Sequence, residues 1–472
     1  MKARTLFVAW LVIVFVPLQL GRPQCPTADT LAFLNLAQES HSSIIINGDA
    51  DFTSQSITEG WQGNGTASSP YVIDNYTISS LEYALSISQV SVSFVIRRCR
   101  LTSVFLYGPC VSLNNVSNAV IELCIINSFA IGVGLYLVRN CTLNSNWIGG
   151  GRESLSLRES YSCTFTNNVL PNGGISFDSA DLAGFRHTFS NNTVVSRPLG
   201  YFYNVTGWNI DASSFGQLFI IGSDHCYVST GNFRDVPYGV LLVGCQDCEL
   251  VSCVAYQSRY GVVILTSGNV TISNCSLSSN LYSGLSINRS SNCFIFTNSI
   301  YSNRGFGIDV LGPNVRIVSN LISSNEGGIL AIPGNGEVQT YGGLVVYNDI
   351  HGNTKHGILL QNGVSGFRVY GNWFHSNAPN AWDDASGNQW DDGIGMGNAW
   401  DDYYYDVGFY QVGGTAISID HYANGTVLTN PSDFIPGEIT LALWGLSSAA
   451  LLGIAALLII RTKGTRLGTS QS

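Results

Sequence analysis

Residues 298–310 read NSIYSNRGFGIDV, and residues 320–332 read NLISSNEGGILAI. Each stretch opens on an asparagine, places a second asparagine five positions later, and continues through glycine into alternating apolar residues. Residues 348–360, NDIHGNTKHGILL, repeat the pattern after an insertion, and residues 274–287, NCSLSSNLYSGLSI, carry a looser copy before it. A repeat of about 22 to 24 residues built from short β-branched runs is typical of a stacked β coil.

The repeat also predicts how neighbouring coils hold one another. Short segments such as residues 307–310 and 315–318 alternate between inward and outward positions, so one coil cannot bury its apolar face without the coils above and below it. Asparagines at the same turn of successive coils are expected to hydrogen-bond along the stack. The repeated glycines are expected to supply the positive φ that each bend requires; they are Gly239, Gly261, Gly284, Gly307, Gly328 and Gly357.

These features predict an all-β parallel β-helix over residues 71–380, with roughly thirteen coils at ~4.8 Å per coil. The amino-acid composition excludes two further classes of protein. Only 11% of the 472 residues are charged, but 45% are apolar, so the chain is not intrinsically disordered. The formal net charge of −10 argues against a nucleic-acid partner, which requires a basic surface.

Both ends of the chain are apolar. Lys2 and Arg4 precede an apolar run, which predicts a signal peptide over residues 1–24, with an uncleaved anchor as the alternative. Residues 439–460 carry no charge and are long enough to cross a bilayer as one helix. Basic residues follow this segment, which places the C-terminus in the cytoplasm and the bulk of the chain outside the cell, on a single-pass membrane anchor. The remaining segments are an N-terminal cap (25–70), a linker (431–438) and a basic cytoplasmic tail (461–472).

Glycosylation signals agree with export. Ten asparagines begin an Asn-x-Ser/Thr triplet, as expected for a glycoprotein. An Asn- and Ser-rich chain also produces such triplets by chance. The ten are Asn64, Asn75, Asn115, Asn140, Asn191, Asn204, Asn269, Asn274, Asn288 and Asn424.

Several of the twelve cysteines are one coil apart, such as Cys253 and Cys275. Two interpretations follow: stacked buried thiols, or disulfides between neighbouring coils, which export permits. Because ~4.8 Å between strands is at the short end of the Cα separations that disulfides use, core packing is the favoured interpretation.

The closing segment, residues 381–430, contains three copies of Trp-Asp-Asp. The last coil of a β-helix exposes an apolar end and open strand edges, which aromatic side chains can cover. The aspartates are expected to cap turns, to bind Ca²⁺ through clustered oxygens, or to act in catalysis, in that order of preference. The three copies comprise Trp382, Asp383, Asp384, Trp390, Asp391, Asp392, Trp400, Asp401 and Asp402.

The coil pattern and this ending together resemble the NosD-like right-handed parallel β-helix proteins, whose repeats are also called CASH repeats, and the archaeal surface proteins among them in particular. Residues 388–393, NQWDDG, and 397–403, GNAWDDY, match the two halves of that family's closing motif. The resemblance covers roughly residues 42–425. It implies a right-handed fold and says little about activity.

Function remains open between two classes. The first is a membrane-anchored cell-surface protein that binds glycans or serves as an envelope or adhesion component without catalysis. The second is a polysaccharide lyase, hydrolase or epimerase that acts on one flank of the helix, which requires carboxylates or a base converging there. Copper handling is disfavoured, because two methionines and no histidine cluster offer few soft-metal ligands. The catalytic candidates are Asp309, Asp349, His351, His356 and His375, and His351 and His375 are expected one coil apart.

Overall fold

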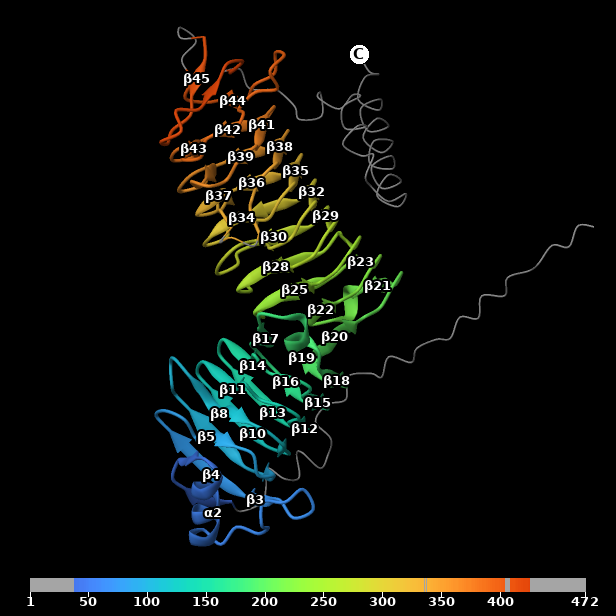
Figure 1. Cartoon of the computed structure of the whole chain (residues 1–472), viewed down its shortest axis with the longest axis vertical. Helices are drawn as coiled ribbons and strands as arrows, with labels where there is room; N and C mark the ends of the chain where they lie inside the picture. Colours follow the sequence, from blue (N-terminus) through green and yellow to red (C-terminus); the bar gives the residue numbers. More distant parts are fainter. Residues whose placement is uncertain (1–37, 335, 337, 404–407, 425–472) are drawn as a thin grey trace, which may run out of the picture. The chain divides into compact units, whose positions relative to one another are not determined.

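The computed structural model describes residues 38–334, 336, 338–403 and 408–424. The predicted signal peptide, membrane-spanning segment and cytoplasmic tail lie outside these residues. Within the described part of the chain, no helix is both long and apolar enough to cross a membrane. The chain forms two compact units, and each is a stack of parallel β coils (Figure 1). Unit 1 holds the residues up to Tyr203 with 212–221 and 232–239, and unit 2 holds 204–211, 222–231 and the residues from Val240 onward.

Unit 1 arranges its strands in three sheets. Its first six coils each contribute one strand to every sheet, and the first sheet continues for three further strands. The first sheet contains β1 (Glu39–His41), β4 (Tyr76–Ser80), β7 (Arg100–Ser103), β10 (Ile125–Ser128), β13 (Trp147–Gly150), β16 (Val169–Leu170), β19 (Thr193–Val194), β20 (Arg197–Tyr203) and β22 (Gln217–Ile221). The second contains β2 (Ile44–Asn47), β5 (Leu85–Val90), β8 (Pro109–Val116), β11 (Ile131–Tyr136), β14 (Glu153–Arg158) and β17 (Ile175–Asp178). The third contains β3 (Tyr71–Asp74), β6 (Phe94–Arg97), β9 (Ala119–Glu122), β12 (Thr142–Asn144), β15 (Thr164–Thr166) and β18 (Thr188–Ser190).

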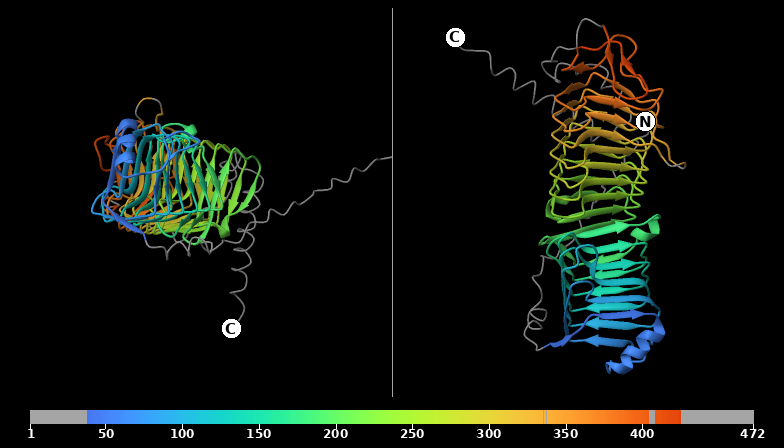
Figure 2. Two further views of the ribbon diagram at one scale, coloured as in Figure 1. Left: turned by 90° about the horizontal axis from the view of Figure 1, so that it is seen from below. Right: turned by 90° about the vertical axis from the view of Figure 1, so that its left-hand side faces the viewer.

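A short helix covers the first coil of unit 1. Helix α2 (Asp49–Thr58) follows β2 and lies across the first coil (Figure 2). Its buried Phe52 packs against Tyr71 and Phe94, with ring centroids 5.1 and 5.0 Å away. The helix therefore covers apolar residues that the first coil leaves without a neighbour. The β-helix begins at β1, which lies upstream of residue 71, where the sequence predicts its start. Two 3-10 turns, Leu182–Phe185 and Ala212–Ser214, complete the helical content of the described residues.

Unit 2 repeats the three-sheet plan. Its first sheet contains β25 (Tyr238–Val243, whose first two residues belong to unit 1), β28 (Tyr260–Leu265), β31 (Leu285–Asn288), β34 (Phe306–Leu311), β37 (Gly327–Ala331), β40 (Ile358–Leu360) and β43 (Ala381–Asp383). The second contains β21 (Asn209–Asp211), β23 (Tyr227–Ser229), β26 (Glu249–Val251), β29 (Thr271–Ser273), β32 (Phe294–Phe296), β35 (Arg316–Val318), β38 (Leu344–Val346) and β41 (Arg368–Tyr370). The third contains β27 (Val254–Tyr256), β30 (Ser276–Ser278), β33 (Ser299–Tyr301), β36 (Leu321–Ser323), β39 (Asp349–His351), β42 (Trp373–His375) and β44 (Ala399–Trp400). Strand β24 (Asn232–Arg234) belongs to unit 1, and β45 (Tyr410–Gln411) and β46 (Ile419–Asp420) form an antiparallel pair.

The predicted asparagine stacking is confirmed. In five successive coils of unit 2 one asparagine per coil is buried at the turn between the second and third sheets, and we call this series the inner column. The Asn320 side chain accepts hydrogen bonds from the backbone N and Nδ2 of Asn298 at 2.9 and 3.0 Å, and donates Nδ2 to Asn348 Oδ1 at 3.0 Å. Each side chain thus joins two coils. The inner column comprises Asn298, Asn320, Asn348, Asn372 and Asn398, and a second column at the next turn comprises Asn280, Asn303, Asn325, Asn353 and Asn377.

The repeated glycines play a different part from the predicted one. Residues with positive φ lie immediately before the column asparagines: Thr297, Ser319 and Tyr347 have φ of 52°, 54° and 56°. Gly307 and its repeats are not among the residues with positive φ. A Cβ on Gly307 would lie 2.9 Å from the Gly328 carbonyl oxygen and 3.0 Å from Asn325 Nδ2. Glycine is needed here because the adjacent coil and the second column come too close for any side chain.

Cysteines occupy the earlier positions of the inner column. The Cys253 backbone N–H points at Cys275 Sγ at 3.4 Å, and the Cys275 N–H donates to Asn298 Oδ1 at 2.9 Å. All eleven described cysteines are buried and none forms a disulfide, which confirms the favoured interpretation for them. Burial raises the pKa of the Cys293 thiol to about 12. These thiols are therefore core packing groups.

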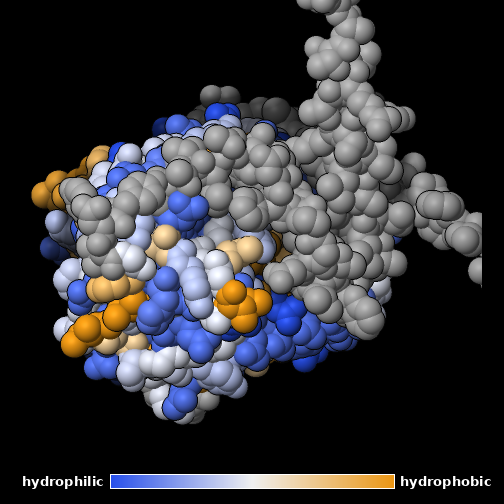
Figure 3. All heavy atoms as spheres, turned by 90° about the horizontal axis from the view of Figure 1, so that it is seen from above, coloured by the Kyte–Doolittle hydropathy of each residue, from blue (hydrophilic) through white to orange (hydrophobic). Residues whose placement is uncertain are grey.

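The Trp-Asp-Asp segment covers the last coil of unit 2. Trp390 and Trp400 are each 1% exposed, and Trp400 stacks between Phe374 and Tyr410 with centroid distances of 4.6 and 4.0 Å. Asp420 Oδ2 ends the inner column by accepting from Asn398 N and Nδ2 at 2.7 and 3.1 Å. In the end-on view of Figure 3, most of the visible described surface at this end is hydrophilic or neutral. The closure that the sequence predicts is thus present.

Candidate functional site

Two neighbouring strands of the third sheet of unit 2 place four polar or aromatic side chains on the outside. Strands β39 and β42 pair in parallel, with Asp349 opposite Trp373 and His351 opposite His375. The residues between them, Ile350 and Phe374, are fully buried. Because side chains alternate across a strand, the aspartate, both histidines and the tryptophan all face outward.

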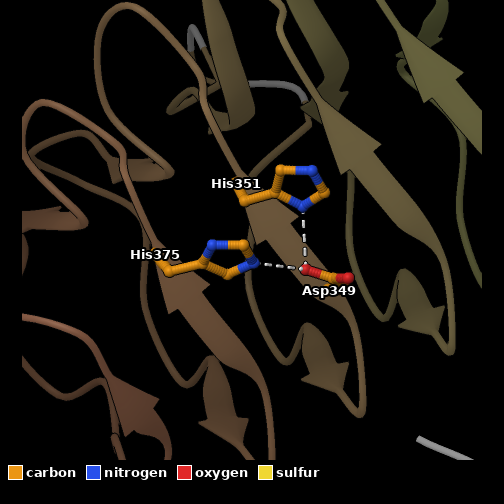
Figure 4. Close-up of side chains that lie close together, drawn as sticks. All are labelled: Asp349, His351 and His375. Atoms are coloured by element: carbon orange, nitrogen blue, oxygen red, sulfur yellow. Dashed lines mark hydrogen bonds and ion pairs between the residues drawn. The ribbon is translucent and has the colours of Figure 1, made fainter. Parts of the chain in front are cut away.

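The resulting Asp–His–His cluster consists of Asp349, His351 and His375 (Figure 4). Asp349 Oδ1 lies 2.9 Å from His351 Nδ1 and 3.1 Å from His375 Nε2. The two imidazole rings are stacked, with centroids 4.4 Å apart and planes 15° apart. Trp373 stacks on His375 at 3.8 Å. One carboxylate oxygen therefore orients two imidazoles, and an indole ring supports one of them.

The cluster is open to solvent. The side chains of Asp349, His351 and His375 are 22%, 32% and 20% exposed. In the hydrogen-bonded arrangement His351 carries its proton on Nδ1 and His375 on Nε2, because a carboxylate oxygen can only accept. The opposite ring nitrogens are then acceptors when the imidazoles are neutral. The cluster can thus contact a ligand while two of its members are held in place.

The cluster continues a longer series on the same face, which we call the outer row. Strand register aligns Tyr256 with Ser278, Ser278 with Tyr301, Tyr301 with Ser323, Ser323 with His351, and His351 with His375. Successive members are therefore one coil, or ~4.8 Å, apart. Tyr301 is 38% exposed, whereas the two serines are 7% and 8% exposed. Aromatic rings thus stand out along the row and hydroxyl groups lie between them.

Two predicted catalytic candidates lie elsewhere. Asp309 is on β34 in the first sheet, half-buried, and accepts a hydrogen bond from Ser283 Oγ. Burial raises the pKa of Asp309 to about 6, and the Ser283 hydrogen bond opposes this rise. His356 precedes β40, where burial and the Lys355 charge lower its pKa. Among the described residues, its buried Nδ1 has no hydrogen-bond partner. Neither residue joins the Asp–His–His cluster.

The six aspartates of the Trp-Asp-Asp copies are bound to protein donors. Asp383 accepts from Ala385 N, Asn388 Nδ2, Trp390 Nε1 and Ser418 Oγ. Burial alone would raise the pKa of Asp392, but the N–H groups of Met396, Ile394 and Gly395 lower it below its usual range. The remaining four accept from residues of the closing segment or the last coils: Asp384 from Thr415, Asp391 from Gly393 and His421, Asp401 from Ser376 and Asn380, and Asp402 from Asn380 and Tyr410.

These contacts match turn capping and closure. Within the described residues, the one group of three or more His, Cys, Asp or Glu side chains placed to share a metal ion is Asp349, His351 and His375. The six closing aspartates are not brought together in that way. Calcium binding at this segment stays a prediction.

The ten sequon asparagines are exposed or half-buried, and two of them, Asn115 and Asn288, lie within strands. Seven of them have positive φ, as Asn115 (52°) and Asn269 (52°) illustrate; the others are Asn64, Asn288 and Asn424. Asparagine tolerates the left-handed region better than most residues. Turn geometry alone thus accounts for many of the asparagines, and their glycosylation stays a prediction.

Sequence reasoning paired His351 with His375 and named Asp349, but it missed Trp373 and Tyr301. A signal was present for Trp373. It stands two positions before His375, as Asp349 stands two positions before His351. The same spacing in consecutive coils puts all four side chains on one face. Tyr301 had no signal beyond the repeat register.

Comparisons with known proteins concern the fold. A family model described as a right-handed beta helix region matches residues 216–374. Similar solved structures include a double mutant of the periplasmic alginate epimerase AlgG, at 13% identity over 79% of this chain and 85% of that chain, with a TM-score of 0.35. The A-module of the mannuronan C-5 epimerase AlgE6 of Azotobacter vinelandii is 13% identical over 85% of this chain and 95% of that chain, with a TM-score of 0.26. The enzymatically active domain of tailspike protein 2 of bacteriophage CBA120 is 13% identical over 58% of this chain and 43% of that chain, with a TM-score of 0.24. No curated protein matches the sequence. At these values the likenesses carry no argument about function.

Proposed function

We propose that this protein is a cell-surface β-helix protein that binds polysaccharide along the outer row of unit 2 without altering it. The observation that carries the proposal is the outer row itself, with Tyr256, Tyr301 and the histidines projecting and serines between them. Aromatic rings offer large rigid contact faces, and hydroxyl and imidazole groups offer hydrogen bonds. A linear sugar chain lying along the stack would meet the exposed rings of Tyr301, His351 and His375 in turn.

Placement at the cell surface rests on the sequence. The apolar segment 439–460 is proposed as the membrane anchor, and the sequons and N-terminal apolar run fit export. The resemblance to NosD-like CASH-repeat proteins of archaeal surfaces supports the same placement. Anchored at its C-terminal end, the protein would present the outer row to extracellular glycans.

A second function, catalysis on a polysaccharide, is favoured by the Asp–His–His cluster. A carboxylate that orients an exposed imidazole is a common arrangement for general-base chemistry. Glycoside hydrolysis usually needs two carboxylates on either side of the scissile bond. Asp349 is the only carboxylate on strands β39 and β42, so binding without hydrolysis is the better-supported proposal, and epimerase or lyase chemistry is the form that catalysis would take.

The test is binding and turnover with the full-length protein in detergent. Acidic and neutral polysaccharides are arrayed, and new reducing ends and unsaturated sugars are measured in parallel. Tyr301→Ala and Trp373→Ala should each weaken binding about fivefold, because one aromatic contact contributes on the order of 1 kcal/mol. Tyr136→Ala is the matched control, since Tyr136 is 39% exposed but lies on β11 in unit 1.

Equal binding by all three variants would exclude the outer row as the site. Product formation that disappears in His351→Ala would replace binding with catalysis as the function of this flank. Binding without product, weakened in Tyr301→Ala and Trp373→Ala and unchanged in the control, is the expected result.

A further inference from the structure

We propose that the Asp–His–His cluster is a binding site for one divalent transition-metal ion of the zinc class, held by Asp349 Oδ1, His351 Nδ1 and His375 Nε2. The proposal goes beyond glycan binding and does not depend on it. It also revises the sequence-based view that the chain lacks clustered histidine ligands, because the coil register brings together two histidines that are 24 positions apart in the chain.

The donor set fits this class of metal. Two imidazole nitrogens and one carboxylate oxygen are ligands that Zn²⁺ accepts, whereas Ca²⁺ and Mg²⁺ prefer oxygen alone. Three protein ligands leave the fourth tetrahedral position for water or a ligand. All three donor atoms lie within 4.8 Å of one another.

The two separations that involve Asp349 require only a small adjustment. With bonds of ~2.0–2.1 Å and tetrahedral angles, neighbouring donor atoms around zinc lie about 3.3 Å apart. The Oδ1–Nδ1 and Oδ1–Nε2 separations are 2.9 and 3.1 Å. The side chains are partly exposed, so widening each of these separations by a few tenths of an ångström requires rotation about side-chain bonds and no movement of the core. Metal binding would also place each imidazole proton on the opposite ring nitrogen, so that Nδ1 of His351 and Nε2 of His375 offer their lone pairs.

The scaffold holds the donors in place before a metal arrives. Both histidines and the aspartate project from paired strands, whose inner residues Ile350 and Phe374 are fully buried. Trp373 packs on the His375 ring at 3.8 Å and restrains its rotation. Sites on rigid strands that need little reorganisation bind ligands more tightly than sites on loops.

The position of the cluster gives the ion a role in recognition. His351 and His375 are consecutive members of the outer row, and the site is open to solvent. The free coordination position would therefore be available to hydroxyl or carboxylate oxygens of a bound sugar. This last step rests on the proposed function, whereas metal binding itself does not.

The experiment is a titration of the full-length protein, stripped of metal with a chelator, with Zn²⁺ alone and no glycan. Isothermal calorimetry gives stoichiometry and affinity, and Co²⁺ substitution gives an absorption spectrum that reports nitrogen and oxygen ligands directly. The variants are His351→Ala, His375→Ala and Asp349→Asn. His225→Ala is the matched control, because His225 also lies near an aspartate, with Nε2 3.7 Å from Asp247 Oδ2, but is outside the cluster.

The expected result is one Zn²⁺ per chain, with affinity about a hundredfold weaker in each histidine variant and unchanged in the control, as loss of a ligand predicts. Asp349→Asn keeps the shape of the side chain but loses the charge, and should weaken binding by a smaller factor. Circular dichroism of each variant verifies folding. If the double variant lacking both histidines binds Zn²⁺ as tightly as the parent, or if the parent shows no stoichiometric binding, the proposal is wrong. Because no sugar is present, either outcome leaves the glycan test independent.

Discussion

Asn348 and His351 are three residues apart in one coil, yet their side chains point to opposite sides of the coil wall of unit 2, that is, to the core and to the solvent. Asn348 is 1% exposed. Its side chain forms hydrogen bonds with Ile317, Asn320 and Asn372 in neighbouring coils and with Val346 in its own coil. The His351 side chain is 32% exposed and meets Asp349 and His375 on the outside. The inner column repeats one residue type through five coils, whereas the outer row changes from tyrosine to serine to histidine. What the stack requires is repeated, and what it leaves unconstrained is available for function.

The largest effect on stability is expected from a substitution in the inner column. Asn348→Ala removes the acceptor of the Asn320 N and Nδ2 groups and the donor to the Ile317, Val346 and Asn372 oxygens. Buried polar groups left unsatisfied cost about 1–3 kcal/mol each, and partial rehydration reduces the sum. We expect a loss of ~3–5 kcal/mol in the free energy of unfolding. Urea titration followed by hydrogen exchange would measure the loss and locate it in the affected coils.

Asn362→Ala is the control for this substitution. Asn362 is exposed in a turn of the next coil of unit 2, and its replacement should change stability by no more than ~0.5 kcal/mol. If the two variants lost the same stability, the inner column would contribute no more than a surface turn, and the contrast between the two sides of the wall would not hold.

The contrast also explains how far the sequence predicts this molecule. Asparagine, glycine and apolar residues recur because each coil must pair with the next, so their period reveals the fold, the stacking and the closure by Trp390 and Trp400. The prediction that Gly307 supplies a positive φ was wrong. A repeated glycine shows that the position requires glycine, but the repeat alone does not tell whether the cause is a positive φ or close packing. Tyr301 was missed for the converse reason: the fold does not require it, so no repeat marks it. Trp373 was missed although its spacing to His375 matches that of Asp349 to His351.

A smaller effect is expected where the column carries sulfur in place of an amide. Cys275→Ala leaves the Cys253 N–H without its sulfur contact at 3.4 Å and creates a small cavity. Sulfur is a weak acceptor, so the expected loss is ~1–2 kcal/mol in the same urea assay. A loss as large as that of Asn348→Ala would mean that packing, and not the amide hydrogen bonds, stabilises the column.

The outward Asp309 gives an effect that depends on pH. Burial raises its folded-state pKa to about 6, above the value of ~3.9 expected in the unfolded chain. Between pH 4 and 6 the folded state binds more protons than the unfolded state, so stability falls as pH rises through this window. Because the side chain is half-buried, the contribution is discounted to on the order of 1 kcal/mol.

Asp309→Asn should flatten the dependence of the unfolding free energy on pH between about 4 and 6, with little change at the acid end. Glu326→Gln is a suitable comparison, since Glu326 is a carboxylate of the same unit paired with Lys355 at the surface. A slope that persists in Asp309→Asn would assign the proton uptake to another group.

The smallest effect on stability is expected in the outer row, and it is the one that separates the two sides most sharply. His351→Ala leaves every bond of the inner column in place and removes one ring from a solvent-exposed stack, so the unfolding free energy should change by no more than ~0.5 kcal/mol. The same variant is expected to lose most of its zinc affinity. Unfolding and metal titration on one preparation would show whether the two properties separate. If His351→Ala were as unstable as Asn348→Ala, the cluster would belong to the structural part of the wall, and the outer row would have to be explained by stability before any ligand is considered.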